Sequence, residues 1–427
     1  MGEVISYYED VPRCSFCNKT EDQVHKLVTG NNAAICDECI ELCVEIISEE
    51  RLNQADHDSV KLISPSRMTA FLNRFVVGQD NAKRTLSVAV YNHYKRVNLQ
   101  LIDEANKLAH SIMAEDSSLS QVEISKSNVL LLGPSGTGKT YLAQSLARMM
   151  NVPFTIVDAT TLTEAGYVGD DVETVLQSLL NAADGSIERA ERGIIYIDEI
   201  DKIARKTGEN TSITRDVSGE GVQQALLKLI EGTTATVPLK GTRKHEEQEM
   251  VRINTEGILF MCGGAFVGLD DIIRKRLGTR ASGFGADWSV SEMSAEDVLE
   301  HVTPEDLAEF GLLPEFVGRM PIITSLRALH EDDLVKILTE PHNALVKQYQ
   351  KLFAAEEVEL SFTSEALTQV AALALERGTG ARGLRSIMEK ILEEAMYVIP
   401  DRNDIRRVII DEDVVLGKQS AGLEMKD

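Results

Sequence analysis

The chain has 427 residues, of which 43% are hydrophobic and 26% are charged, and its 68 acidic and 44 basic residues give a net charge of −24. This length predicts two or three domains, each with its own core. No apolar run approaches the roughly 18 residues that span a bilayer, and the first ten residues lack the features of a signal peptide. A chain this acidic is also poorly suited to bind the negatively charged phosphate backbone of nucleic acid. We therefore expect a cytoplasmic protein that binds neither membranes nor, by default, nucleic acid.

Four cysteines near the start have the spacing of a metal site. Cys14 and Cys17 form one C-x-x-C turn, and Cys36 and Cys39 form a second after an interval of 18 residues. Such turns place four thiolates on one tetrahedral Zn²⁺, and metal binding supplies the folding energy that so short a segment lacks. Disulfides are the alternative, but a cytoplasmic chain disfavours them. The sequence therefore predicts a four-cysteine zinc site.

The zinc-binding domain is expected to span residues 1–52. It includes a helix over 37–50, on which Cys43 is expected to be a small apolar residue and not a fifth ligand. The polar segment 53–66 ends in Ser-Pro-Ser and is predicted to be a linker to the rest of the chain.

Residues 133–140 read Gly-Pro-Ser-Gly-Thr-Gly-Lys-Thr, which is a complete G-x-x-x-x-G-K-T phosphate-binding loop. The apolar run 128–132 predicts a strand before the loop, and 141–150 predicts a helix after it. In this frame backbone N–H groups converge on a polyphosphate, Lys139 reaches the β- and γ-phosphates, and the Thr140 hydroxyl ligates Mg²⁺. The residues expected to contact nucleotide are Gly133, Pro134, Ser135, Gly136, Thr137, Gly138, Lys139, Thr140 and Tyr141. The chain is therefore predicted to bind a nucleoside triphosphate.

A pair of carboxylates follows the apolar run 194–197. The pattern is typical of a central parallel strand that delivers Asp198 and Glu199 at its C-terminal edge. We expect Asp198 to hold Mg²⁺, directly or through water, and Glu199 to polarise the attacking water as the general base. An Asp-Glu pair is common by itself, but at 59 residues after Lys139 it indicates a nucleotide hydrolase.

Two further apolar runs, 152–158 and 257–264, predict strands of the same sheet. Between the loop and the carboxylates stands Gly-Tyr-Val-Gly, an aromatic and aliphatic pair between glycines at 166–169. These residues alone leave open whether Tyr167 packs back onto the domain in a turn or is exposed for a function.

Arg382 lies in a helix-like segment late in the chain, after Gly-Ala. A surface ion pair is the ordinary role of a lone arginine. A cation aimed at a phosphate is the alternative, because a guanidinium is always charged and bridges phosphate oxygens.

Taken in order, these motifs resemble those of the ClpX family, the AAA+ ATP-dependent unfoldase subunits of the Clp protease. The resemblance covers about residues 12–412 and includes Val-Val-Gly-Gln at 76–79, Arg-Lys-His at 243–245 and Pro-Glu-Phe-Val-Gly-Arg at 314–319. Its most specific feature is the zinc module joined to this ATPase, since many AAA+ proteins share the phosphate loop and the Asp-Glu pair.

The resemblance implies an α/β fold in three parts. A small N-terminal zinc-binding module precedes a P-loop AAA+ large domain (67–322), in which helices flank a parallel sheet. A smaller, mainly helical α+β domain (323–416) and a C-terminal tail (417–427) follow. The resemblance also implies a homo-hexamer with ATP at the subunit boundaries, and ATP, Mg²⁺ and Zn²⁺ as cofactors.

The resemblance further implies roles for residues around the nucleotide. Val76 and Val77 match the box on the adenine side. Arg319 matches the arginine finger, which reaches into the site of the neighbouring subunit and stabilises charge on the γ-phosphate. Arg382 matches the sensor-2 arginine, which couples the small domain to the nucleotide. With them, Lys139, Asp198 and Glu199 make up the expected catalytic set.

The family also implies an axial pore that grips protein substrates. On this basis Tyr167 belongs to the first pore loop, where bulky side chains on flexible hinges hold an extended polypeptide while the ring pulls it. The residues matched to pore loops are Tyr167, Val168 and Arg215, and those matched to the basic loop at the pore entrance are Arg243, Lys244 and His245.

Three departures from the family pattern are visible. The loop that docks on the ClpP peptidase carries Ile-Gly-Phe in the family but Ser282, Gly283 and Phe284 here, which weakens its apolar anchor by about 2 kcal/mol per loop. The strand 257–264 ends in Cys-Gly-Gly, as in the family, and offers no sensor-1 residue of the kind seen in many other AAA+ proteins. The segment 101–127 is longer than the family pattern and is expected to be a solvated insertion.

The leading hypothesis is an ATP-driven unfoldase that feeds tagged or unfolded protein substrates, with adaptors, to ClpP. A remodeller that works without a protease is an alternative favoured by Ser282. A zinc-bearing nucleic-acid motor or clamp loader is a less favoured alternative, because the chain is acidic and carries Gly-Tyr-Val-Gly. A non-catalytic scaffold is the least favoured, since the hydrolytic residues are present.

Overall fold

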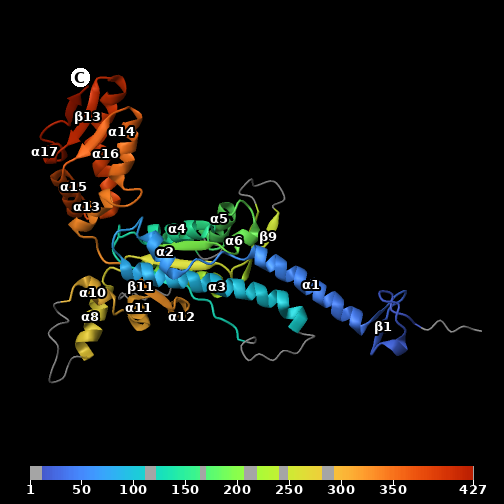
Figure 1. Cartoon of the computed structure of the whole chain (residues 1–427). Coiled ribbons are helices and arrows are strands. Elements are labelled where there is room, and N and C mark those ends of the chain that lie inside the picture. The colour runs from blue at the N-terminus through green and yellow to red at the C-terminus, as the bar shows by residue number, and fades with distance from the viewer. Residues whose placement is uncertain are drawn as a thin grey trace, which may run out of the picture. The chain divides into compact units, whose positions relative to one another are not determined.

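This computed structural model describes residues 12–110, 122–163, 170–205, 219–239, 249–280 and 293–426. The chain divides into two compact units, one of 1–61 with 94–124 and the other of 62–93 with 125–427. Figure 1 labels elements of both units. Within the described ranges, no helix is both long enough and apolar enough to cross a membrane.

In the first unit an antiparallel hairpin leads directly into a helix. The hairpin pairs Val28 with Ile35. Helix α1 continues past residue 52, so the segment predicted as a linker is helical as far as Asp58, because it contains neither Gly nor Pro before Pro65. The elements are η1 (Glu21–Gln23), β1 (Leu27–Thr29), β2 (Ala34–Cys36) and α1 (Asp37–Asp58).

Helix α3 (Asp80–His110) starts in the second unit and ends in the first. It therefore occupies the first part of the segment 101–127, which was expected to be a solvated insertion. Within the first unit, Asn98 of α3 binds the backbone of Val60 twice, through Oδ1 (3.0 Å) and Nδ2 (2.8 Å).

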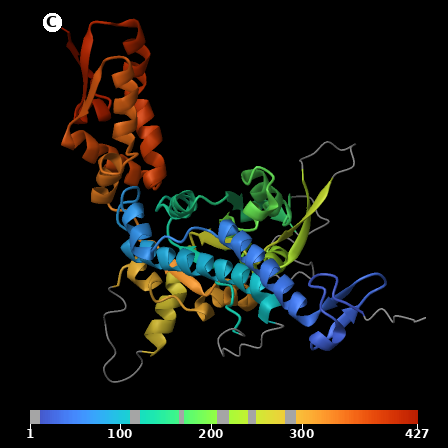
Figure 2. The ribbon, with the colours of Figure 1, turned by 45° about the vertical axis from the view of Figure 1, so that its right-hand side comes forward.

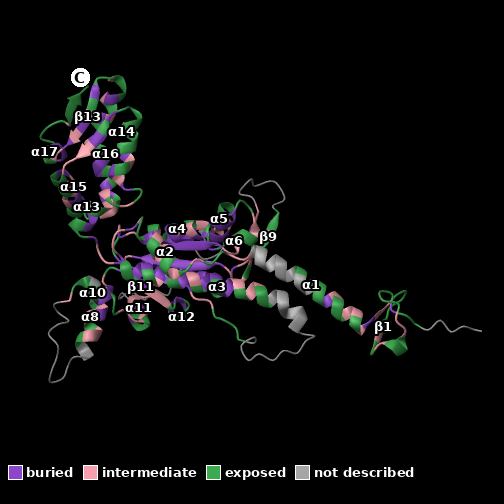
Figure 3. Cartoon of the chain, viewed as in Figure 1, coloured by how far each residue is buried: buried purple, intermediate pink, exposed green. Residues whose placement is uncertain are grey.

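A five-stranded, fully parallel sheet forms the centre of the second unit. Its order is β11-β3-β10-β7-β4. The central strands are buried, which explains their continuous apolar runs (Figure 3). The predicted parallel core is confirmed, whereas the edge strand β11 was not predicted because its apolar run is only two residues long. The strands are β3 (Val129–Leu132), β4 (Phe154–Asp158), β7 (Ile194–Asp198), β10 (Leu259–Gly264) and β11 (Ile322–Ser325).

Helices α4 (Lys139–Met150) and α5 (Thr174–Ala182) pack on this sheet. The short hairpin β8–β9 pairs Val237 with Val251. The other elements of this part are α2 (Pro65–Leu72), η2 (Ala159–Thr161), β5 (Leu162–Thr163), β6 (Asp170–Asp171), α6 (Ile187–Ala190), η3 (Ile200–Ile203), α7 (Glu220–Glu231), β8 (Thr234–Pro238), β9 (Met250–Asn254), α8 (Leu269–Arg280), α10 (Ala295–Leu299), α11 (Pro304–Phe310) and α12 (Pro314–Gly318).

The C-terminal part of the second unit has a hydrophobic core of its own, separate from that of the sheet (Figure 2, orange to red). Its small sheet has the order β12-β13-β14. Strand β14 lies in the segment 417–427 that was predicted to be a tail, and it pairs antiparallel with β13. The elements are α13 (Glu331–Thr339), α14 (Leu345–Ala355), β12 (Glu359–Phe362), α15 (Ser364–Glu376), α16 (Ala381–Val398), η4 (Ile399–Asp401), β13 (Ile405–Ile410), α17 (Glu412–Val415) and β14 (Gly422–Met425).

Candidate zinc-binding and nucleotide-binding sites

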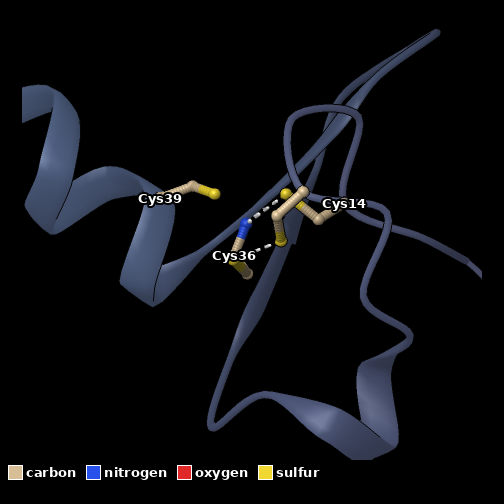
Figure 4. A group of neighbouring side chains, drawn as sticks. Cys14, Cys36 and Cys39 are labelled. Carbon is tan, nitrogen blue, oxygen red and sulfur yellow. Dashed lines mark hydrogen bonds between the residues drawn. The ribbon is translucent and has the colours of Figure 1, made fainter.

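The four predicted zinc ligands come together in the first unit, and Figure 4 labels three of them, Cys14, Cys36 and Cys39. The Sγ atoms of Cys14, Cys17, Cys36 and Cys39 all lie within 4.8 Å of one another, and those of Cys17 and Cys36 are 3.6 Å apart. Zn–S bonds of about 2.3 Å in a tetrahedron require sulfurs about 3.8 Å apart, so this donor set fits Zn²⁺. Cys43 is half-buried and lies outside the cluster. The predicted four-cysteine site is therefore confirmed.

The thiols of this cluster differ in how easily they ionise. Burial acts to raise the pKa of Cys14, but hydrogen bonds from the backbone of Cys17, Phe16 and Cys36 lower it to about 6. Burial raises the pKa of Cys36 and of Cys39. One thiolate is thus available near neutral pH, and a bound metal has to displace the protons of the other thiols.

Removal of zinc is expected to unfold the zinc module. Of the side chains described between 12 and 58, only those of Cys14, Cys36 and Val44 are both apolar and buried, so the metal has to replace a hydrophobic core. A strong chelator should make the module sensitive to trypsin, while nucleotide binding, which uses the second unit, should persist. The control Cys43→Ser should retain zinc. A module that resists trypsin after zinc has been removed would contradict this expectation.

The phosphate loop connects β3 to α4. Gly133, Gly136 and Gly138 adopt φ values of 138°, 80° and 98°, which residues with a Cβ rarely adopt. A Cβ on Gly138 would meet no atom within 4 Å, so space is open at the start of α4, where N–H groups favour an anion. Lys139 lies over the loop and donates from Nζ to the carbonyl oxygens of Gly133 (2.6 Å) and Pro134 (2.9 Å). The loop is thus shaped to hold a phosphate group.

Binding of ATP is expected to be coupled to proton uptake by Lys139. Burial lowers the pKa of this lysine to about 8, with Asp198 opposing the shift and Arg382 adding to it. A phosphate beside the ammonium favours the charged form and raises that pKa again. Above pH 8 the free protein must therefore gain a proton on binding, and its affinity should fall by up to about tenfold per pH unit.

Calorimetric titration with ATP in two buffers of different ionisation enthalpy measures this proton uptake. It should be clear at pH 8.5 and absent at pH 7, where Lys139 is already charged. Equal apparent enthalpies in both buffers at pH 8.5 would show that Lys139 is not the titrating group.

Thr140 and Asp198 meet at the C-terminal edge of the sheet. Thr140 Oγ1 donates to Asp198 Oδ2 at 3.1 Å. Hydroxyl and carboxylate oxygens are ligands that Mg²⁺ accepts, so the pair fits the ion. The structure thus brings together the two residues predicted to hold it.

Glu199 follows Asp198 in an unusual backbone conformation. Its φ of 56° and ψ of 33° lie in the left-handed region, and its N–H donates to Asp198 Oδ1 at 3.0 Å. Such a conformation costs a non-glycine residue about 1 kcal/mol and is concentrated at functional sites. The turn leaves the Glu199 side chain exposed, directly beside the predicted Mg²⁺ ligand.

A cleft beside the phosphate loop is lined by residues from both ends of the second unit. Val76 and Val77, which the resemblance assigns to the adenine side, form part of it, and Arg382 at the start of α16 contributes from the C-terminal part. Arg382 Nη1 donates to Ser135 Oγ at 3.3 Å, so the predicted sensor-2 residue contacts the phosphate loop. The remaining lining residues are Phe75, Gly136, Thr137, Gly138, Lys139, Thr140, Tyr141, Leu329, Ile337 and Ala381.

Sequence reasoning missed the apolar wall that Phe75, Leu329 and Ile337 give this cleft. Their only sequence signal was apolar character at helical spacing, which predicts a core and does not distinguish a ligand-facing position.

The segment that carries Val76 and Val77 is held in place by polar contacts. Lys83 is buried, and its Nζ donates to the carbonyl of Val76 and to Asn73 Oδ1, both at 2.8 Å. Gln79 binds the backbone of Arg327 twice, by donating to its carbonyl (2.9 Å) and accepting from its N–H (3.0 Å). The cleft wall is therefore tied to the segment that leads into the C-terminal part.

Arg319 lies far along the sheet from the phosphate loop of its own chain. Its carbonyl accepts a hydrogen bond from Asn128 Nδ2 (2.9 Å), just before β3, whereas Gly133 begins the phosphate loop just after β3. Five residues of extended strand correspond to roughly 16 Å. The Arg319 guanidinium is half-exposed and binds Glu231 Oε1 through Nε (2.8 Å) and Nη2 (2.7 Å). Arg319 thus stands apart from the residues that surround its own nucleotide cleft.

Nine predicted residues lie outside the described residues, and their roles stay predictions. They are Tyr167, Val168, Arg215, Arg243, Lys244, His245, Ser282, Gly283 and Phe284.

The fold and the site define a class of protein: a P-loop ATPase of the AAA+ type. Residues 124–323 match the AAA domain of the Cdc48 subfamily, and residues 54–153 match the IstB-like ATP-binding protein family. The chain is therefore an ATPase.

Two further matches specify the kind of AAA+ ATPase. Residues 12–49 match the ClpX C4-type zinc finger, and residues 329–408 match the C-terminal, D2-small domain of ClpB protein. This combination of zinc finger, AAA domain and small domain fits a ClpX-like AAA+ unfoldase. Such a family implies assembly into an oligomeric ring and the handling of protein substrates.

Proposed function

We propose that the chain forms a homo-hexameric ring that unfolds protein substrates with the energy of ATP and translocates them through its pore into the ClpP peptidase. Tagged or unfolded proteins and their adaptors are the proposed substrates and partners. We also propose a cytoplasmic location, which suits a chain whose cysteines form no disulfide and of which four are placed to bind zinc.

The placement of Arg319 carries this proposal. An arginine that precedes β11 at the N-terminal edge of the sheet is too far from its own phosphate loop to reach a γ-phosphate bound there. Its exposed guanidinium is instead available to the cleft of an adjacent copy. A contact that uses different surfaces on the two copies closes into a ring when repeated.

At each nucleotide cleft, five residues have a proposed task in hydrolysis. Lys139 and the loop N–H groups bind the phosphates, and Thr140 and Asp198 would hold Mg²⁺, which would neutralise charge on the phosphates. Glu199 orients the attacking water and takes up its proton. Arg319 of the neighbouring copy stabilises the charge that develops on the transferred phosphoryl group.

The lining of the cleft supports the coupling of hydrolysis to mechanical work. The cleft joins Val76 and Val77 to Leu329, Ile337 and Arg382, so nucleotide contacts both the sheet and the C-terminal part of the second unit. A change in the nucleotide therefore changes the forces between these two parts. In the ring, Tyr167 and Val168 are the residues we propose to grip the substrate, with Arg215 and the basic residues at 243–245 at the pore.

The proposal is tested by mixing the purified protein with ATP, a tagged fluorescent protein and ClpP. Loss of fluorescence together with proteolysis is expected. Tyr167→Ala should keep ATPase activity and lose unfolding of the tagged substrate. Unchanged unfolding by this variant would contradict the proposed role of Tyr167.

A remodeller that works without a protease is the second candidate, and Ser282 at the predicted docking loop favours it. Fluorescence lost without proteolysis in the same experiment would support this candidate over delivery to ClpP. Replacement of Ser282 by Ile should then restore proteolysis, because it supplies the apolar anchor that the docking pocket requires.

A further inference from the structure

Two buried side-chain amides of the second unit have no task in the proposed mechanism. Asn128, directly before β3, is 1% exposed, and Gln223, in the first turn of α7, is 0% exposed. Amide side chains are mostly found at the surface, and buried ones persist where their polar atoms find hydrogen-bond partners. The partners of these two amides therefore indicate what the amides hold in place.

Asn128 binds the backbone of the residue proposed as the arginine finger. Its Nδ2 donates to the carbonyl of Arg319 at 2.9 Å and to that of Ile230, near the end of α7, at 3.4 Å. Its Oδ1 accepts from the N–H of Phe260 in β10 at 3.3 Å. Two carbonyls on one side and an N–H on the other fix which end of the amide carries the nitrogen. Asn128 thus ties Arg319 to the central sheet and to α7.

Gln223 binds the other end of the same segment. Arg319 directly follows the short helix α12, and Gln223 Oε1 accepts from the N–H of Leu313, directly before α12, at 2.7 Å. Gln223 Nε2 donates to the carbonyls of Ile203 (2.8 Å) and Gly311 (3.4 Å). Ile203 ends η3, which follows the strand that carries the catalytic carboxylates. The start of α12 is therefore tied to α7 and to η3.

Helix α12 depends on such contacts for its position. A helix of five residues is too short to be stable by itself, so its neighbours have to fix it. Phe316 and Val317 pack into the core of the sheet domain, and the two amides hold the backbone at either end. The Arg319 side chain, in contrast, makes only a surface ion pair with Glu231, which is weak. The backbone is thus fixed, while the guanidinium is free to exchange its partner.

We propose that Asn128 and Gln223 are positioning residues that hold α12 at both ends and so set where Arg319 presents its guanidinium to the adjacent subunit. This inference rests on the proposed role of Arg319 in the neighbouring cleft. Stabilisation of a transition state depends steeply on geometry, and a misplacement of about 1 Å can cost about 100-fold in rate. The effect of losing either amide should therefore appear in the cleft of the neighbouring copy and not in the cleft of the same chain.

The test uses Asn128→Leu and Gln223→Met in the full chain, because these substitutions remove the polar atoms and keep approximately the same shape. Each variant should bind a fluorescent ATP analogue with nearly wild-type affinity, while kcat for ATP hydrolysis falls about 100-fold. Gln224→Met, the same substitution at the adjacent, exposed position of α7, is the matched control and should keep the wild-type kcat. Where one variant fails to fold, the other decides. Loss of nucleotide binding in both would contradict a role confined to the finger.

Mixing experiments show which cleft an amide serves. A subunit of either variant keeps its catalytic base but lacks a correctly placed finger. After subunit exchange with Glu199→Gln subunits, which keep the finger, ATPase activity should rise well above that of either protein alone. Exchange with Arg319→Ala subunits, which lack the finger, should give no such rise. The reverse pattern would show that the amide serves the cleft of its own chain, and it would overturn the inference, as would a rise with neither partner.

The pair of Glu199→Gln and Arg319→Ala separates this inference from the proposed function on which it rests. If that pair regains activity and both amide variants have the wild-type kcat, the positioning role of Asn128 and Gln223 is wrong and the role of Arg319 stands. If that pair regains no activity, the role of Arg319 in the neighbouring cleft is wrong, and this inference falls with it.

Discussion

A Glu199→Gln variant is expected to bind ATP and assemble normally but to hydrolyse ATP at least about 100-fold more slowly, the usual contribution of a general base. The amide has nearly the shape of the carboxylate but cannot accept the proton of the attacking water. Lys139, Thr140 and Asp198 are unchanged, so nucleotide and Mg²⁺ keep their proposed ligands. Steady-state ATPase rates and equilibrium binding of a fluorescent ATP analogue separate the two effects.

The left-handed conformation of Glu199 makes glutamine the appropriate substitution. The strain lies in the backbone of that turn. Glutamine has the same branching at Cβ as glutamate, so it leaves the backbone strain unchanged. Glu188→Gln, at an exposed position of α6, is the matched control and should hydrolyse ATP at the wild-type rate. Near-normal turnover by Glu199→Gln would exclude this residue as the general base.

The parts of the molecule that could be predicted from sequence depend on residues close together in the chain. The phosphate loop and its frame are a strand, a turn with glycines at positive φ, and a helix, and the continuous run 128–150 specifies all three locally. The zinc site likewise follows from two short turns. Even the approach of Thr140 to Asp198 follows from two local patterns, because the parallel strands of one sheet bring their C-terminal ends to one edge.

The parts that could not be predicted depend on packing between distant segments. Leu329 and Ile337 line the cleft only because α13 lies where the C-terminal part joins the sheet domain. Strand β14 escaped prediction because the exposed run Gly422–Met425 becomes a strand only through its pairing with β13. The tie between Gln79 and the backbone of Arg327 joins residues 248 positions apart. No local pattern contains such information.

An Arg319→Ala variant is expected to bind ATP at its own cleft and yet to lose most hydrolysis, by about 1,000-fold, as when an arginine finger is removed. The lost guanidinium belongs to the site of the neighbouring copy, so binding of nucleotide should change little. Its ion pair with Glu231 lies at the surface and contributes only about 0.5 kcal/mol to stability, so the fold should be unaffected. Glu231→Gln is the matched control and should keep ATPase activity, since the only proposed role of Glu231 is to pair with Arg319 while no neighbouring copy is bound.

Mixing two inactive variants tests whether Arg319 acts on the neighbouring copy. Glu199→Gln subunits keep the finger but lack the base, and Arg319→Ala subunits keep the base but lack the finger. In rings assembled from equal amounts of both, some clefts contain both groups, because an Arg319→Ala subunit supplies the base and the adjacent Glu199→Gln subunit supplies the finger. This arrangement occurs at about a quarter of the interfaces in a cyclic ring. ATPase activity should therefore reappear after the mixed subunits have been allowed to exchange. If Arg319 served its own chain, every subunit in the mixture would still lack one group, and no activity would return.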